Sequence, residues 1–300
     1  MNTWQTDFRD FLESQGRAQN TVQAYCRDLQ VYARWYEATN KEPFSPGKLV
    51  APDLREWRNH SINVEKVNPA TWNRRRISLI VFANWCIQEV FIQGDPLQGV
   101  NPMAIVELPP YWLNPDEFRR VRRHMDIAIN TANTELQRNT AIRDRAINSL
   151  MLYAGLRVSE VVNLHQIDLL LREKSGHVNV RCGKGDKSAL EIPLGKEARL
   201  ALQAWLDIHQ QEDDLLFEGL SARQIQRSVS DLGVAAKLDA PLTPHRFRHT
   251  YIRRLSVDDE GKPVNPGSWV AFLARHSTRR TTERYYQASR DDHQRMVENM

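Results

Sequence analysis

Residues 244–250 read Pro-His-Arg-Phe-Arg-His-Thr, and this segment predicts a helix with basic side chains on one face. Proline is favoured in the first turn of a helix, where its missing N–H would have no partner. We therefore expect a helix over residues 244–255. Residues three apart share a helix face, so His245 and Arg248 lie together. Such a pair suits an anion, because the arginine guanidinium matches the geometry of phosphate oxygens.

Two segments that precede this helix each place one cation beside glycine. Residues 153–160 read Tyr-Ala-Gly-Leu-Arg-Val-Ser-Glu and put Arg157 near an expected helix start, where free backbone N–H groups favour anions. Lys184 lies between two glycines at the tip of an expected hairpin, from which its long side chain can reach a ligand. Taken alone, each residue is more typical of a surface ion pair or a solvated turn.

Further titratable residues follow toward the C-terminus. Tyr285 lies nine residues after His276 and directly before Tyr286. A tyrosine pair alone is more typical of helix packing than of chemistry. His245 and His249 stand four apart, as in zinc-binding helices, but Arg246 occupies the position of the glutamate in that motif. The sequence contains no glycine-rich phosphate loop and no paired carboxylates.

The periodicity along the chain predicts a mainly α fold with a small antiparallel sheet. Residues 177–181 and 189–193 are short strand-like runs on either side of a turn rich in glycine and lysine, as in a β-hairpin. Apolar residues at helical spacing predict helices elsewhere. In the first part of the chain these helices cover residues 3–14, a segment capped by Asn20-Thr21 that runs to residue 36, residues 52–59 and residues 69–91. In the second part a long helical stretch begins at a cap in residues 114–116 and extends through residues 143–153. Further helices cover residues 196–211, 222–237, 244–255, 268–275 and 278–287.

Residues 93–112 predict a domain boundary, because they carry four prolines and two glycines without helical periodicity. We expect a helical domain over residues 1–95, a linker over 96–112 and a second domain over 113–300 that ends in a tail. The length of 300 residues suits two domains of ordinary size.

The composition restricts the class of protein. The chain has 41 basic and 37 acidic residues, so its net charge of +4 does not by itself predict nucleic-acid binding. No apolar run is long enough to span a membrane, and the first residues lack a basic segment followed by an apolar one, so we expect neither a membrane anchor nor a secretory signal. Three scattered cysteines fit a reducing cytoplasm.

Taken together, the motifs resemble the tyrosine recombinase (phage integrase) family, in particular its short Xer-like members. Five motifs stand in the family's order and at close to its spacings: 154–160 (AGLRVSE), 183–187 (GKGDK), 244–250 (PHRFRHT), 273–277 (LARHS) and 281–285 (TTERY). Asn20-Thr21, Tyr25 and Asp28-Leu29 resemble the family's N-terminal core-binding domain. The resemblance implies a helical, SAM-like core-binding domain, followed by an α+β catalytic domain with a small antiparallel sheet.

The resemblance also implies the chemistry of the site. Arg157 and Arg248 would bind the scissile phosphate, and Tyr285 would attack it to give a 3′-phosphotyrosine and a free 5′-hydroxyl. Lys184 would protonate the leaving oxygen, His245 would act in acid–base transfer and His276 would bond the phosphate. No cofactor and no metal are implied, because the arginines neutralise charge and the phosphotyrosine conserves bond energy.

Three features depart from the family's usual pattern. Arg275 replaces the glycine that usually precedes the histidine of the fourth motif. Residues 256–268 form a polar segment that is a few residues longer than in the shortest relatives. The loop geometry near His276 therefore does not follow from the resemblance. Tyr286 competes with Tyr285 for the role of nucleophile, although the spacing Thr-Thr-x-x-Tyr favours Tyr285.

Double-stranded DNA with an inverted-repeat core site is the expected partner. In the first domain Arg74, Arg75 and Arg76 would contact it, and in the second domain Arg223, Gln224 and Arg227 would reach base edges or phosphates. The resemblance implies a dimer on each site and a tetramer in the synapse, either of identical chains or with a related recombinase, and docking of the tail 289–300 on a neighbouring protomer. Two alternatives are a DNA-binding architectural protein of the same fold without chemistry and a nicking enzyme similar to type IB topoisomerases.

Overall fold

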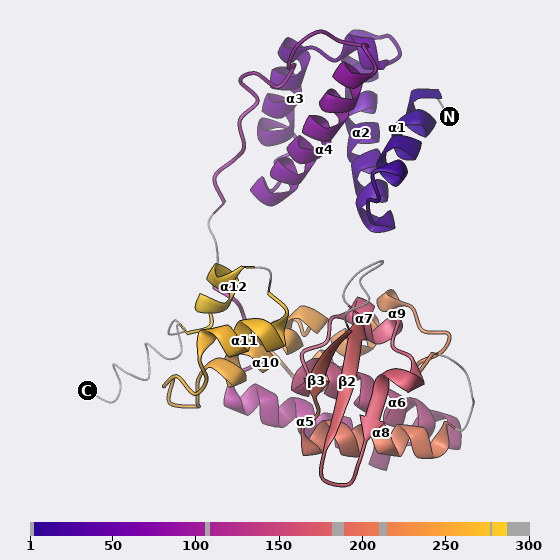
Figure 1. The fold of residues 1–300 in the computed structure, drawn as a ribbon, viewed down its shortest axis with the longest axis vertical. Helices are drawn as coiled ribbons and strands as arrows, with labels where there is room; N and C mark the ends of the chain where they lie inside the picture. Colours follow the sequence, from indigo (N-terminus) through magenta and orange to yellow (C-terminus); the bar gives the residue numbers. More distant parts are fainter. Residues whose placement is uncertain (1–2, 106–108, 182–188, 210–214, 277, 287–300) are drawn as a thin grey trace. The chain divides into compact units, whose positions relative to one another are not determined.

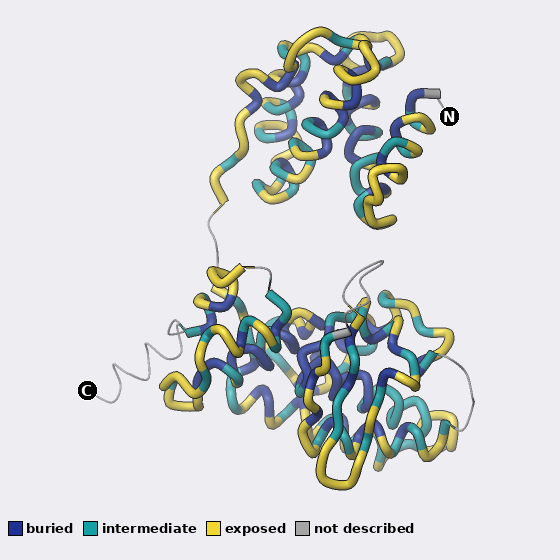
Figure 2. Tube along the Cα trace, viewed as in Figure 1, coloured by how far each residue is buried: buried dark blue, intermediate teal, exposed yellow. Residues whose placement is uncertain are grey.

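The structure, a computed structural model, describes residues 3–105, 109–181, 189–209, 215–276 and 278–286. The chain divides into two compact units, Met1–Glu107 and Leu108–Met300 (Figure 1). Each unit has its own buried core, formed by the helix and strand faces that turn inward (Figure 2). No helix in the described part of the chain is both long enough and apolar enough to cross a membrane.

The first unit is entirely helical in its described residues. Its elements are α1 (Thr3–Ser14), α2 (Gln19–Asn40), the 3-10 turn η1 (Pro46–Lys48), α3 (Ala51–Asn63) and α4 (Pro69–Gln88). Aromatic side chains fill the space between the helices, where Tyr32 packs edge-on against Trp57 and Phe44, and Trp57 packs against Trp72. Such rings bury large apolar areas, so these few contacts account for much of the packing.

The predicted cap of α2 is wrong by two residues. Gly16 adopts φ 69° at the end of α1, and Arg17 N–H donates to the Leu12 carbonyl across this turn. The turn is so tight that α2 starts at Gln19, with Ala18 as a cap that offers no side-chain bond. Asn20 therefore lies inside the first turn of the helix.

The second unit consists of packed helices with one small sheet beside them (Figure 1). Its helices are α5 (Pro115–Asn130), α6 (Glu135–Tyr153), α7 (Val158–Val162), α8 (Lys196–Ile208), α9 (Ala222–Ala235), α10 (Pro244–Ser256), α11 (Gly267–Ala274) and α12 (Arg279–Glu283), with a 3-10 turn η2 (Gln166–Asp168). The sequence predicted one continuous helical region where α5 and α6 are separate. Asn114 caps α5 in a reciprocal capping box with Glu117, and Thr134 caps α6, so each helix has its own start signal.

The sheet has three antiparallel strands in the order β1 (Leu169–Leu171), β2 (Gly176–Arg181) and β3 (Ala189–Pro193). The two predicted strands pair as β2 and β3, with Val178 opposite Ile192. Strand β1 was not predicted, because three consecutive leucines show no alternation of apolar and polar residues. Val178, Val180 and Ile192 are buried in the core of this unit, and the mainly α class with a small antiparallel sheet is confirmed.

Candidate active site

Helix α10 holds the segment 244–250 in a fixed orientation. Pro244 occupies the first turn of the helix, as the sequence predicts, and the Thr243 side chain caps it by accepting from the Arg246 N–H. The Arg246 side chain points into the core, where Nη2 lies 2.7 Å from both carboxylate oxygens of Glu117. The Arg246 guanidinium also lies 4.1 Å from the centre of the Tyr111 ring. This anchoring sets which face of α10 carries Arg248 and His249.

Arg248 lies at the centre of the basic cluster. Its side chain is buried, and its two terminal nitrogens donate to the carbonyl oxygens of Gly155 and Ala274. Burial lowers the Arg248 pKa, and together with the neighbouring guanidinium groups of Arg157 and Arg275 it brings the value to about 10. Arg248 still carries its charge at neutral pH, so the cluster has a strongly positive centre.

Arg157 reaches the same place from the other side of the unit. It precedes α7, and its Nη2 donates to the Arg275 carbonyl at 3.2 Å while Nη1 lies 2.8 Å from Glu160 Oε1. The turn before it requires Gly155, which has φ 63°. A Cβ at this position would lie only 2.2 Å from Tyr251 Cδ1. The glycine therefore lets the chain pass close to α10, and its carbonyl can meet Arg248.

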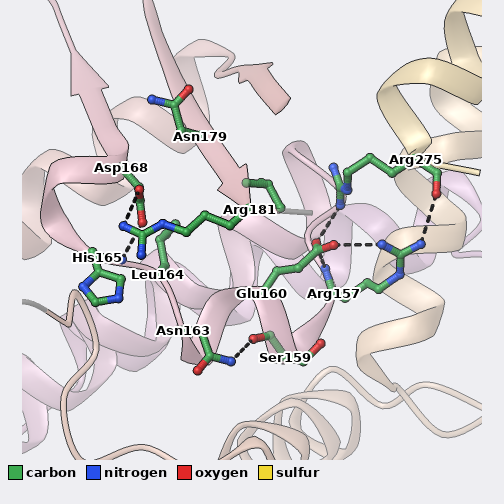
Figure 3. Close-up of a pocket in the computed structure, with 11 residues that line it drawn as sticks. Arg157, Ser159, Glu160, Asn163, Leu164, His165, Asp168, Asn179, Arg181 and Arg275 are labelled. Carbon is green, nitrogen blue, oxygen red and sulfur yellow. Dashed lines mark hydrogen bonds and ion pairs between the residues drawn. The ribbon is translucent and has the colours of Figure 1, made fainter. Parts of the chain in front are cut away.

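Glu160 and Arg275 complete this cluster (Figure 3). Glu160 lies between two cations, with Oε1 toward Arg157 and Oε2 2.7 Å from Arg275 Nη2. The same Arg275 nitrogen lies 3.0 Å from the Gly155 carbonyl. Arg157, Glu160 and Arg275 line one end of a pocket of about 750 Å³ that continues to Asp168 and Arg181.

His276 and Tyr285 form the side of the cluster toward α12. Their rings are stacked with centres 6.0 Å apart, and His276 Nδ1 lies 2.8 Å from the Thr282 hydroxyl. Burial lowers the His276 pKa to about 4, and the charges of Arg248, Arg157 and Arg275 act in the same direction. His276 is therefore neutral at physiological pH.

Tyr285 is buried and its hydroxyl contacts α10. The Tyr285 oxygen lies 2.5 Å from His249 Nδ1, and Arg253 Nη1 donates to the Tyr285 carbonyl at 2.6 Å. Burial raises the Tyr285 pKa to about 12, although Arg248 and Arg284 oppose that rise. The same kind of burial lowers the His249 pKa to about 4, with His245 as the next largest cause.

Tyr286 lies in different surroundings. Its hydroxyl donates to the Asn265 carbonyl at 2.5 Å, in the segment between α10 and α11. Among the described contacts of Tyr286, none joins it to Arg157 or Arg248. Only Tyr285 of the two therefore has a phenol within the field of the central arginine.

Two predicted catalytic residues remain, His245 and Lys184. His245 is exposed and lines a smaller pocket of about 330 Å³ together with His249, Arg284 and Tyr285. The ring centres of His245 and His249 are 6.5 Å apart. The described residues contain no group of three histidine, cysteine or acidic side chains placed to hold a metal. Lys184 lies outside the described residues, as does the tail 289–300.

The arginines predicted to contact DNA in the first unit have partners within that unit. Arg74 is paired at 2.5 Å with Asp28, Arg75 at 2.9 Å with Glu65, and Arg76 donates to the Val100 carbonyl at 2.6 Å. In the second unit, α9 carries Arg223 and Arg227 on its exposed side. Gln224 belongs to a capping box with Ser221, so its amide serves the helix start.

Three residues of the site were not given a role from the sequence. The sequence places Glu160 in the motif 154–160, suggests His249 only as a zinc ligand, and marks Arg275 only as a departure from glycine. The sequence does carry a signal for two of them. Glu160 is three residues after Arg157, and His249 follows Arg248 directly, so both share local turns with the predicted arginines.

Comparison with known proteins identifies the class. The phage integrase family matches residues 118–292, and the N-terminal SAM-like domain of phage integrases matches residues 4–91. The chain therefore belongs to the phage integrase family, whose members are tyrosine recombinases.

Individual relatives agree with this assignment. The chain is 28% identical over 287 residues to tyrosine recombinase XerD of Ralstonia nicotianae, covering 92% of this chain and 86% of that protein. It is 31% identical to tyrosine recombinase XerC of Escherichia coli over 66% of this chain and 65% of that protein. Its fold is similar to the crystal structure of the XerH site-specific recombinase bound to a palindromic difH substrate, with a TM-score of 0.70. The two sequences are 19% identical, and the match covers 93% of this chain and 78% of the XerH chain.

Proposed function

We propose that this chain is a site-specific DNA recombinase that cleaves and rejoins strands through Tyr285. The observation that carries the proposal is that the buried Tyr285 phenol lies in the field of the buried Arg248, which itself lies beside Arg157, in a chain of the phage integrase family. A phosphodiester gains negative charge on its non-bridging oxygens during substitution, and two fixed guanidinium groups stabilise that charge.

The reaction begins with the scissile phosphate at the guanidinium groups. There it replaces the backbone carbonyls of Gly155, Ala274 and Arg275 that now accept from these arginines. Arg248 is 5% exposed and Tyr285 is 2% exposed, so DNA gains access only when α11 and α12 shift away from α10. Helix α12 has only five residues, and so short a helix is suited to this movement.

The chemical step transfers the phosphate from a DNA oxygen to the phenol. The Tyr285 oxygen forms a bond to phosphorus and the bond to the 5′-oxygen breaks, which leaves a 3′-phosphotyrosine. The phenol must lose a proton, and neutral His249 at 2.5 Å is placed to accept it. The 5′-oxygen must gain a proton, for which Lys184 is our proposed donor. His245 and His276 would assist proton transfer and phosphate binding.

We also propose how the chain engages DNA. The helical residues 1–95 and the residues 113–300 are taken as separate DNA-binding and catalytic domains joined by the linker 96–112. Relatives described as bound to core sites include a lambda integrase dimer, which supports duplex DNA as the substrate and a dimer on each site. Recombination between two sites then requires four protomers and a Holliday junction, either of this chain alone or with a related recombinase.

A covalent adduct tests the proposed function. A core site would first be recovered by selecting duplexes that the full chain binds from a random-sequence library. A nick beside the cleavage position then lets the short product diffuse away and traps the adduct. We expect a denaturation-resistant adduct with the wild-type chain and with Tyr286→Phe, and none with Tyr285→Phe. Tight binding without any adduct would indicate an architectural protein, and nicking without exchange between two sites would indicate a topoisomerase-like enzyme.

A further inference from the structure

Arg275 adopts a backbone conformation that normally requires glycine. It ends α11 with φ 53° and ψ 47°, in the left-handed region, and the His276 N–H donates across the turn to the Ala271 carbonyl at 3.1 Å. Glycine is the usual residue at such a helix end, because a Cβ is disfavoured there. An arginine at this position carries a conformational cost that glycine would avoid.

The Arg275 side chain lies inside the cluster. It is 6% exposed, and its Nη2 contacts both Glu160 Oε2 at 2.7 Å and the Gly155 carbonyl at 3.0 Å. Each of these acceptors is shared with one of the two central arginines, since Glu160 also binds Arg157 and Gly155 also binds Arg248. The backbone of the same turn offers the Ala274 and Arg275 carbonyls to those arginines.

Arg275 changes the net charge of the group formed with Arg157 and Glu160. With glycine at position 275, Arg157 and Glu160 would form a neutral pair, and the carboxylate would repel a phosphate bound at Arg157. With Arg275 present, one carboxylate is shared by two guanidinium groups, which leaves a net positive charge. Because the Glu160 and Arg275 side chains are only 14% and 6% exposed, solvent screens their interaction weakly.

We propose that Arg275 is a positioning residue that neutralises Glu160, so that Arg157 keeps its charge available for the scissile phosphate. Arg275 acts through Glu160 and need not touch the DNA. Glu160 can then remain in place as the residue that orients Arg157, because its oxygens accept from both the Arg157 backbone N–H at 2.7 Å and the Arg157 side chain. The inference rests on the proposed function, since it concerns the same phosphate.

The test compares single-turnover adduct formation on the nicked core-site duplex. We expect Arg275→Gly to slow it by roughly 10- to 100-fold, although the change removes the unfavourable backbone conformation. Arg275→Lys should retain an intermediate rate, because it keeps the charge without the two-acceptor geometry. Arg119→Gln serves as the matched control, since it also removes one positive charge but lies on the exposed start of α5 with Asp116 as its partner.

The decisive variant adds Glu160→Gln to Arg275→Gly. Glutamine removes the carboxylate charge but keeps an acceptor for Arg157, so the double variant should cleave faster than Arg275→Gly alone. A rate for Arg275→Gly equal to the wild-type rate would overturn the inference, as would a double variant no faster than the single one. Thermal melting of every variant shows that it is folded. Failure of the proposed function is distinguishable, because the wild-type chain would then form no Tyr285-dependent adduct at all.

Discussion

The Tyr285 hydroxyl lies 2.5 Å from Nδ1 of His249, and this contact joins two groups of the site whose pKa values burial shifts in opposite directions. Burial raises the Tyr285 pKa to about 12 and lowers the His249 pKa to about 4. At neutral pH the phenol keeps its proton and the imidazole has a free acceptor nitrogen. Both shifts disfavour proton transfer in the resting site, so in the proposed mechanism the proton moves to His249 only as the Tyr285 oxygen bonds to phosphorus, which makes the phenol more acidic.

Removing the acceptor should slow the chemical step without weakening binding. We expect His249→Gln to reduce the single-turnover rate of adduct formation by about 10²- to 10⁴-fold, the range for one general base. Glutamine can still hydrogen-bond the phenol but cannot take its proton. DNA affinity, measured by fluorescence anisotropy on the same duplex, should stay within a few-fold of wild type. An unchanged rate would show that another group accepts the proton.

The buried histidines should make the stability of the second unit sensitive to acid. His249 and His276 each have a pKa of about 4 in the folded state and about 6.5 when unfolded. Between these values the unfolded chain binds protons that the folded chain does not, so stability falls as pH decreases from about 6.5 to 4. As the pH falls across this range, the melting temperature should decrease less in His249→Gln than in the wild-type chain. If the melting temperatures of the two proteins decrease equally with pH, the lowered pKa of His249 would be contradicted.

The ion pair between Arg246 and Glu117 should be essential for the second unit. Both side chains are 3% exposed, so removing one leaves a buried charge without its partner. We expect Glu117→Ala to lower the free energy of unfolding by about 3–5 kcal/mol, the usual cost of breaking a buried pair. Urea denaturation measures this change. Arg119→Ala, which breaks an exposed pair in the same helix, is the control and should cost less than about 1 kcal/mol.

DNA contacts of α9 can be tested through the dependence of affinity on salt. Arg223 and Arg227 are exposed, so neutralising both should leave the fold intact. If both contact phosphates, the double change to glutamine should reduce the salt slope by about 2, roughly one for each arginine. The same slope in wild type and variant would exclude phosphate contacts for this pair.

The salt dependence of DNA affinity also tests the arginines of the first unit, but there the substitutions affect stability as well. Neutralising Arg74, Arg75 and Arg76 should weaken binding to all DNA and reduce its salt dependence. It should also destabilise the unit, because Asp28 is buried and loses Arg74 as its partner. Arg74→Gln with Asp28→Asn separates the two effects, since it removes the cation without leaving the carboxylate unpaired. If the salt slope is unchanged in a folded triple variant, these residues do not contact DNA.

Much of the fold could be predicted from the sequence, since helix signals are local. Proline at position 244 and the caps Asn114 and Thr243 act on their own turns, and the helices begin where these residues indicate. The start of α2 was mispredicted because the tight turn at Gly16 brings the chain into the helix before Asn20. Strand β1 has no periodic pattern and forms only because β2 offers it a partner.

The site could be predicted only in part, because its geometry depends on contacts between distant segments. Arg157, Arg248 and Tyr285 stand in motifs that can be recognised in the linear sequence. The contact of His249 with Tyr285 and the sharing of Glu160 by two arginines join residues up to 115 positions apart. Arg275 looked like a departure from the expected glycine, and its place in the cluster becomes apparent only when the turn after α11 is folded.

The most direct test of the central claim is to identify the residue that carries the DNA in the trapped adduct. The adduct formed by the wild-type chain on the nicked core-site duplex would be digested with protease and nuclease, and the modified peptide sequenced by mass spectrometry. We predict a 3′-phosphonucleotide on Tyr285. A nucleotide on Tyr286 or on any other side chain would contradict the account.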